Sequence, residues 1–243
     1  MKEGSLVLSL FPGIGLLDRA FEEEGFCVVR GPDLLWGGDV KRFHPPKGRF
    51  DGVIGGPPCQ RYGGLANFAH RWLVKPAHLI PEFERCVIES APAWFLMENV
   101  RNAPLPQVPG YIVSSQLLNN RWLGEVQSRL RRFSFGSRDG RRLNIETIAL
   151  ESKEFAQGVT SANGGERRVH GRKATGGRIT RYTVPEALRL QGLPPDFFGF
   201  RSPFTMKARL KVVAEGVPLP MGRAIARSIK AALADVAYKK EAA

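Results

Sequence analysis

The chain has 243 residues, of which 43% are hydrophobic, and its 36 Lys and Arg residues against 23 Asp and Glu give a net charge of +13. This length is typical of one domain with at most a small addition, and the apolar content excludes disorder over most of the chain. No apolar run reaches the roughly 18 residues that cross a bilayer, and the first residues lack a signal-peptide pattern. We therefore expect a soluble, cytoplasmic protein without a membrane partner.

The charge and the cysteines indicate what the protein binds and which thiol could react. A positive field concentrates nucleic acid at the surface, although many small soluble proteins are also basic. Cys27, Cys59 and Cys86 are too few for a disulfide framework and match no zinc spacing, so we expect no bound metal. Because Cys27 and Cys86 lie in apolar runs, we expect both to be buried. Cys59 is then the candidate reactive thiol.

The first hundred residues alternate short apolar runs with glycine-rich or polar turns. This pattern predicts strands over residues 5–10, 26–29, 50–54 and 93–97, and a helix over residues 16–24. Buried strands that alternate with helices are typical of an α/β fold with a mostly parallel sheet covered on both faces. In such folds ligands bind at the carboxyl ends of the strands.

The later part of the chain has a different composition. Residues 151–181 contain six glycines and seven Lys or Arg residues against three Glu, with little apolar periodicity. We expect this stretch to form a basic surface loop or a small lobe that contributes no core. Helix patterns follow over residues 184–190 and 220–236.

Four motifs lie where a site would be expected. Phe11-Pro-Gly-Ile-Gly15 follows the first strand, and such a turn lets a nucleotide-like ligand approach the backbone. Gly55-Gly-Pro-Pro-Cys59-Gln60 presents a thiol on a stiff loop, and Glu98 ends the fourth strand, where an acid could bond a ring nitrogen. In Gln127-Ser-Arg129-Leu-Arg131, alternation would place three donors on one side of a strand. Taken singly, each motif also has a purely structural interpretation.

Together, the order of these motifs resembles that of the cytosine-5 DNA methyltransferases. Phe-x-Gly-x-Gly, Gly-Asp39-Val, Pro-Pro-Cys-Gln, Glu-Asn-Val and Gln-x-Arg-x-Arg follow one another, and the resemblance resumes over residues 181–194 and at Gly216-Val-Pro-Leu-Pro. It implies a Rossmann-like S-adenosylmethionine-dependent methyltransferase fold with a mostly parallel sheet and a small basic target-recognition insert. The implied division is a catalytic segment at 1–136, the insert at 137–181 and a completing segment at 182–243, whose last helix packs beside the first strand.

The resemblance also implies the reaction and its residues. Cys59 would add to C6 of a cytosine flipped out of double-stranded DNA, while Glu98, Arg129 and Arg131 would hold the base. The cofactor S-adenosylmethionine would leave as S-adenosylhomocysteine. The expected cofactor contacts are Phe11, Gly13, Ile14, Gly15, Asp33, Asp39, Val40, Pro57 and Val217. The expected DNA contacts are Gln60, Gln127, Arg167, Arg168, Arg172, Lys173, Arg178 and Arg181.

The chain departs from the family pattern at several positions. Ser9 stands where the first strand usually carries Asp, and Pro32 stands where an acid usually binds ribose, with Asp33 as the substitute. Arg61-Tyr62 follows the thiol loop, and Glu215 stands in place of Asn before Gly-Val-Pro, where it could alter donor preference or rate. The alternatives are a catalytically weak or inactive DNA-binding relative and an enzyme that modifies RNA. We expect a monomer from a bacterial or phage-infected cell, in restriction-modification or as an orphan enzyme, with an unassigned target sequence.

Overall fold

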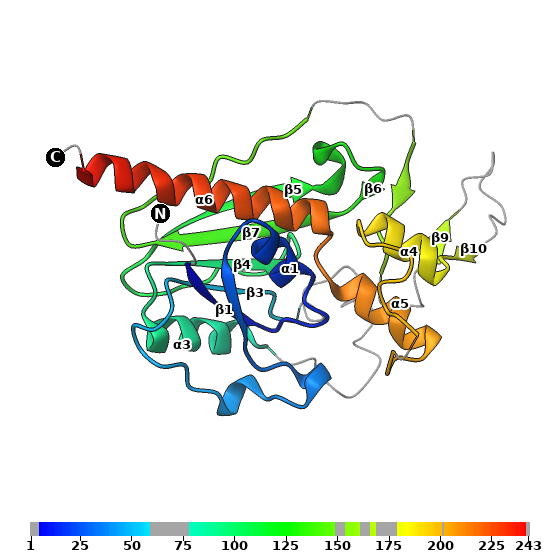
Figure 1. Cartoon of the computed structure of the whole chain (residues 1–243), viewed down its shortest axis with the longest axis horizontal. Helices are drawn as coiled ribbons and strands as arrows, with labels where there is room; N and C mark the ends of the chain where they lie inside the picture. Colours follow the sequence, from blue (N-terminus) through cyan, green and yellow to red (C-terminus); the bar gives the residue numbers. More distant parts are fainter. Residues whose placement is uncertain are drawn as a thin grey trace.

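A six-stranded sheet forms the centre of the protein (Figure 1). The computed structural model describes residues 5–58, 78–148, 154–160, 166–168, 179–200 and 202–241. The strands lie in the order β2-β1-β3-β4-β7-β5, and β1 to β4 run parallel while β7 is antiparallel to both β4 and β5. The predicted α/β fold with a mostly parallel sheet is confirmed. The strands are β1 (Leu6–Leu10), β2 (Cys27–Arg30), β3 (Gly52–Gly55), β4 (Trp94–Asn99), β5 (Ile112–Asn119) and β7 (Leu130–Ser137).

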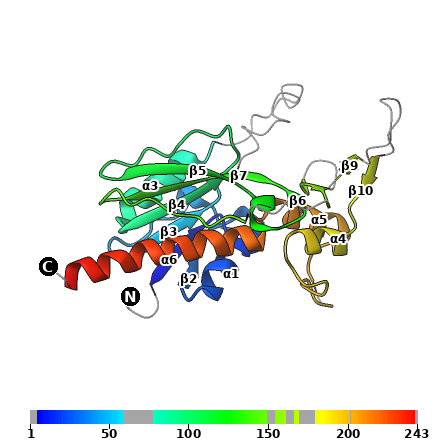
Figure 2. The same cartoon turned by 90° about the horizontal axis from the view of Figure 1, so that it is seen from above.

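Helices cover both faces of this sheet. The helices α1 (Leu16–Glu23) and α6 (Leu219–Glu241) lie side by side on one face, and α3 (Ile80–Ser90) covers the other (Figures 1 and 2). The two helices approach closely at Gly222, where an added Cβ would lie 2.7 Å from the Cβ of Ala20. Each face buries its own apolar cluster, with Val7, Ile54, Trp94 and Ile225 on the α6 side and Leu8, Val53, Phe83 and Phe95 on the α3 side.

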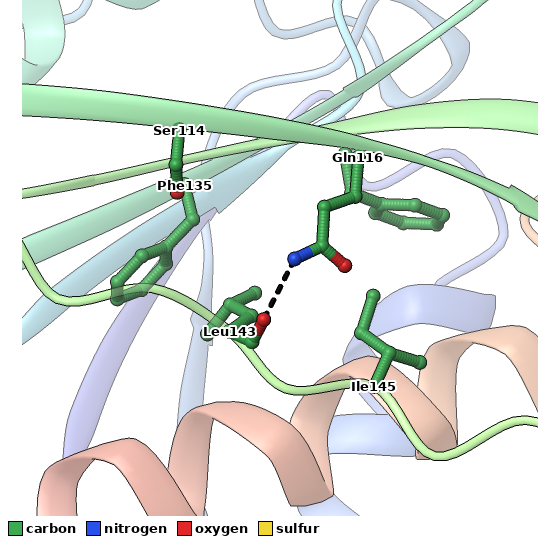
Figure 3. A pocket seen from close by; sticks show the side chains of 6 residues that line it. Ser114, Gln116, Phe135, Leu143 and Ile145 are labelled. Atoms are coloured by element: carbon green, nitrogen blue, oxygen red, sulfur yellow. Dashed lines mark hydrogen bonds between the residues drawn. The ribbon is translucent and has the colours of Figure 1, made fainter.

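The segment that follows β7 packs onto the sheet rather than leaving it. Leu143 is buried in the cluster on the α6 side, and its carbonyl accepts a hydrogen bond of 2.7 Å from Nε2 of Gln116 in β5 (Figure 3). The hydroxyl of Ser228 in α6 donates to the carbonyl of Asn144 at 2.7 Å. Leu143 and Asn144, which fall in the predicted insert, therefore contact the central sheet and α6.

A smaller lobe gathers at the end of the sheet away from the carboxyl end of α6 (Figures 1 and 2). The chain departs here from the expectation that residues 151–181 contribute no core, because Val159 is fully buried against α4, α5 and the start of α1. The lobe contains β6 (Gln127–Ser128) paired with β8 (Ala156–Gln157), the hairpin of β9 (Glu166–Arg168) and β10 (Ile179–Arg181), α4 (Val184–Leu190) and α5 (Met206–Glu215). Short 3-10 turns η1 (Leu34–Trp36), η2 (Val40–Arg42) and η3 (Asn120–Leu123) complete the described elements.

The two described cysteines differ in exposure. Cys86 in α3 is buried as expected, and burial raises the pKa of its thiol to about 11. The expectation for Cys27 is wrong, because this residue is exposed. Cys27 begins β2, an edge strand of four residues that are mostly exposed, so an apolar run did not indicate a buried position. Within the described ranges, no helix has the length and apolar character that a membrane crossing requires.

Candidate active site

A glycine turn joins the end of β1 to α1. Phe11, Gly13 and Gly15 all have positive φ angles, of 57°, 55° and 77°, so the chain turns sharply before the helix begins. Gly15 forms the N-cap of α1 in a left-handed conformation. A Cβ on Gly13 would meet no atom within 4 Å, which leaves open room on that side of the turn. The turn thus lies at the carboxyl end of a strand with open room beside Gly13, where a nucleotide-like ligand binds in such folds.

Asp33 supports this turn from the loop after β2. Its carboxylate accepts hydrogen bonds of 2.8 Å from the backbone N–H groups of Gly13 and Leu35. The indole Nε1 of Trp36 donates to the carbonyl of Gly13 at 2.7 Å. Burial raises the pKa of Glu215 above its ordinary value, and the negative charge of Asp33 adds to this rise. Two carboxyl groups therefore lie near the glycine turn, one from the β2 side and one from the end of α5.

A buried carboxyl group lies beneath the turn. Asp18 in α1 is fully buried and accepts a hydrogen bond of 2.5 Å from the hydroxyl of Ser9 in β1. The other carboxylate oxygen of Asp18 lies 3.1 Å from Nε of Arg30. The Arg30 guanidinium also lies close to Gly15, because a Cβ added to Gly15 would be 2.8 Å from Nη2 of Arg30. Burial raises the pKa of Asp18 in spite of these partners. Asp18 and Ser9 thus link β1 and α1 at the turn.

The loop of Asp39 and Val40 is held by a residue that sequence reasoning did not identify. Asp39 accepts a hydrogen bond from the N–H of Lys41 at 3.0 Å, and Val40 is buried. Nη2 of Arg85, in α3, donates to the carbonyls of Val40 and Phe43 at 2.8 and 3.0 Å. Arg85 lies 45 positions from Val40 in the sequence, so its role follows only from the fold.

An ion pair lies at the carboxyl end of β4. Nε of Arg131, in the neighbouring β7, is 2.9 Å from Oε1 of Glu98, and the two side chains are only 19% and 12% exposed. Burial raises the pKa of Glu98, and the positive charges of Arg131 and Arg129 lower it only in part. A Cβ on Gly56 would lie 3.1 Å from Oε2 of Glu98, so the glycine after β3 leaves space for this carboxyl group.

Asn99 connects this pair to the proline loop after β3. It is buried, and its side-chain N–H donates to the carbonyl of Pro57 at 3.0 Å. Pro57 is itself buried, so the backbone that leads to the thiol is fixed next to Glu98. Cys59 and Gln60, predicted as nucleophile and DNA contact, lie outside the described residues, as does Arg61-Tyr62.

Arg129 does not lie in the row of donors that the alternation predicted. The chain leaves the small sheet at β6 and enters the central sheet at β7, and Arg129 is the residue between them. Its buried guanidinium donates to the carbonyls of Val159 and Ala214 at 2.8 Å and of Gly216 at 3.1 Å. Gln127 is fully buried in β6, which is contrary to the predicted direct contact with DNA.

A family model described as C-5 cytosine-specific DNA methylase matches residues 38–162, more than half of the chain. The chain belongs to this family. It is similar to the type II methyltransferase M.FnuDI of Fusobacterium nucleatum, with 24% identity over 94% of this chain and 95% of that protein. The similarity to type II methyltransferase M.HgiDI of Herpetosiphon aurantiacus is 27% over 63% of this chain and spans only 58% of that relative. The Entamoeba histolytica methyltransferase EhMeth shares the fold, with a TM-score of 0.65, 13% identity, and coverage of 97% of this chain and 99% of that one.

The chemistry of the glycine-turn region fits the methyl donor that this family and fold imply. The turn leaves open room beside Gly13, and the carboxylates of Asp33, Asp39 and Glu215 are acceptors suited to ribose hydroxyls and an adenine amine. Among the other predicted contacts, Ile14 is partly buried against the α4–α5 cluster, and Val217 is buried in the cluster on the α6 side. The side chains of Ile14 and Val217 are therefore fixed by packing in these apolar clusters.

The predicted DNA contacts of the methylase insert fall into two groups. Arg167 and Arg168 lie in β9 and Arg181 in β10, and the antiparallel register pairs Arg181 with Glu166. Arg172, Lys173 and Arg178 lie outside the described residues. In the described part of the chain, no group of three or more His, Cys, Asp or Glu side chains is placed to hold a metal ion.

Proposed function

We propose that this methylase transfers a methyl group from S-adenosylmethionine to C5 of cytosine in double-stranded DNA, with Cys59 as the nucleophile. The observation that carries the proposal is the buried Glu98–Arg131 pair, 2.9 Å apart at the carboxyl end of β4, beside the fixed backbone of Pro57. A carboxyl group and a guanidinium at this separation suit the ring nitrogen and the carbonyl oxygen of one pyrimidine.

In this proposal the Cys59 thiolate forms a bond to C6 of the extruded cytosine, and the electron pair of the C5–C6 double bond moves toward C5. Glu98 donates its carboxyl proton to N3, a role that its raised pKa favours, while Arg131 donates a hydrogen bond to O2. Charge that develops on the ring is thereby neutralised in a site with little water. After methylation, loss of the C5 proton to a base and of Cys59 from C6 restores the double bond. The N3 proton returns to Glu98 when Cys59 leaves.

S-adenosylmethionine, when bound, supplies an electrophilic methyl group. The residues of the protein position this methyl group next to C5 of the cytosine. We assign the open room beside the turn of Phe11, Gly13 and Gly15 to the amino-acid and sugar portions of S-adenosylmethionine, and Asp39 to its adenine amine. Asp33 is already bonded to two N–H groups, and its remaining acceptor sites suit the ribose hydroxyls.

Expression in cells that lack cytosine methylation, followed by mass spectrometry of the DNA nucleosides, tests the proposal. We expect 5-methylcytosine with the wild type and none with Cys59→Ala. Cys27→Ala is the matched control, because Cys27 is an exposed thiol distant in sequence from the motif. Oligonucleotides with 5-fluorocytosine should form a covalent complex that survives denaturation.

Two results contradict the proposal. If 5-methylcytosine is absent with the wild type, or equally abundant with Cys59→Ala, then Cys59 does not carry the reaction. Methyl incorporation by the purified protein should also be compared between duplex DNA and transfer RNA. A strong preference for transfer RNA would reject DNA as the substrate while keeping the chemistry.

A further inference from the structure

Arg129 connects three segments that are far apart in the sequence. Its Nη1 donates to the carbonyl of Val159 in the insert, and its Nη2 donates to the carbonyls of Ala214 and Gly216 at the end of α5. The side chain is only 5% exposed, and all three donor–acceptor distances lie between 2.8 and 3.1 Å. Charge-assisted bonds to buried carbonyls are costly to lose, because the carbonyls would then lack a donor.

Each connected segment belongs to a different part of the site. Val159 follows β8, the strand by which the insert joins the small sheet. Ala214 and Gly216 flank Glu215, and Gly216 lies against the first residue of α1 at the glycine turn, because a Cβ on Gly216 would lie 2.5 Å from Cδ1 of Leu16. Two residues along the chain from Arg129, Arg131 forms the ion pair with Glu98.

Neighbouring hydrogen bonds reinforce this connection. Nε2 of Gln191, which follows α4, donates to the carbonyl of Val213 at 2.7 Å, and the hydroxyl of Tyr182 donates to the carbonyl of Gln157 at 2.9 Å. The backbone N–H of Ala156 donates to the carbonyl of Val126 at 2.9 Å. The insert is thus held to β6 and to Tyr182 before α4, and the end of α4 is held to the end of α5.

We propose that Arg129 is a positioning residue that fixes the insert and the turn at Glu215 relative to each other, so that DNA on the insert and cofactor at the turn bind cooperatively. This inference rests on the proposed function and differs from a direct contact of Arg129 with the base. A guanidinium fork that bonds carbonyls from both segments makes the order of one segment depend on the order of the other. Thermodynamic linkage then requires each ligand to strengthen the binding of the other by the same factor.

The test measures this coupling directly. The dissociation constant of a short cytosine-containing duplex is measured by fluorescence anisotropy with and without saturating S-adenosylhomocysteine. We expect S-adenosylhomocysteine to tighten duplex binding by about fivefold or more in the wild type. In Arg129→Gln this ratio should fall to about one, and in Arg129→Lys it should be intermediate, because an ammonium lacks the planar fork.

Hydrogen exchange of the free protein provides a second readout. In Arg129→Gln, amides of residues 156–160 and 213–217 should exchange faster, while those of β2 and α3 should not change. Arg138→Gln is the matched control. Arg138 also directs a guanidinium at a backbone carbonyl, that of Pro92, and stacks on Tyr111, but it follows the opposite end of β7.

Three outcomes overturn the inference: a wild-type ratio of about one, a wild-type ratio retained by Arg129→Gln, or unchanged exchange in both segments of that variant. If Arg129→Gln does not fold, Arg129→Lys decides by the same two readouts, since it keeps the charge. A wild type that binds both ligands cooperatively but transfers no methyl group contradicts the proposed function and leaves the coupling intact.

Discussion

At the scale of single residues, Glu98 combines burial with a positive neighbour. We predict that Glu98→Gln lowers kcat about 100-fold, because an amide can bond N3 but cannot transfer a proton to it. Glu98 is 12% exposed in its side chain, and burial raises its pKa. The ratio of wild-type to variant kcat should fall as the pH rises through this raised pKa, since the wild type then loses its proton. Steady-state kinetics from about pH 5 to about pH 9 measure this ratio, and a constant ratio would refute the assignment.

The same raised pKa has a consequence for stability. Between the ordinary pKa of a glutamate and the raised value, the folded protein retains a proton that the unfolded chain has lost. The free energy of unfolding of the wild type therefore decreases as the pH rises through this interval. Because Glu98→Gln has no such group, its free energy of unfolding should increase relative to the wild type over the same interval. Urea unfolding of both proteins at matched pH values serves as the control for the kinetics.

The sequence motifs predict Glu98 and Arg131, which the structure brings together, but not the residues that support them. Cys59 stays a prediction, because it lies outside the described residues. The contacts of Asn99 with Pro57 and of Arg129 with Val159 depend on segments separated by 42 and 30 positions. The alternation of side chains along Gln127, Arg129 and Arg131 predicts one face of a single unbroken strand. The chain instead passes from the small sheet to the central sheet at Arg129, so this pattern could not place its side chain.

At the scale of elements, α3 supports the loop predicted to bind adenine. Arg85 bonds two carbonyls of that loop and forms ion pairs with Glu82 and Glu89 at 2.8 Å. We predict that Arg85→Met raises the KM for S-adenosylmethionine about tenfold with little change in kcat, because the loop loses its anchor while the catalytic pair is untouched. The melting temperature should also fall, since two carbonyls lose their donor.

Arg19→Met is the matched control for Arg85→Met. Arg19 forms an exposed ion pair with Glu23 in α1, with side chains 41% and 32% exposed, and such pairs contribute little to stability. Steady-state kinetics and thermal unfolding of both variants should separate a loss of the loop anchor from a general effect of removing an arginine. An unchanged KM in Arg85→Met would show that α3 does not position the cofactor loop.

The sequence predicts several elements within a few residues. The strands β1 to β4 and the helices α1 and α4 lie within about two residues of the predicted ranges, and α6 extends five residues beyond its predicted end. The strand β5 and the helices α3 and α5 were not predicted. In β5 the apolar residues do not alternate with polar ones, and it lies at the edge of the sheet, where one side has no neighbouring strand to bury it.

At the scale of the whole molecule, two apolar clusters cover the faces of the central sheet, and a third joins the insert to the catalytic domain. Val159 of the insert packs with Leu16 of α1, the helix that begins at the glycine turn. Leu143 and Asn144 of the predicted insert are bonded to the central sheet and α6, and Val159 is buried, so the part of the insert free to contact DNA is shorter than residues 137–181. We therefore expect few phosphate contacts and a short recognition sequence.

The net charge of +13 makes this expectation measurable through salt. With about four phosphate contacts, the logarithm of the DNA association constant should fall against that of the salt concentration with a slope of about −3.6, a loss of roughly 100-fold between about 50 mM and about 200 mM. Arg167→Ala, in β9, should reduce the magnitude of the slope by about 0.9. Lys230→Ala removes the same charge from α6, where Lys230 bonds the carbonyl of Glu24, and should leave the slope unchanged. Equal slopes for Arg167→Ala and the wild type would exclude Arg167 from the DNA interface, and a slope near zero in the wild type would exclude phosphate-dominated binding altogether.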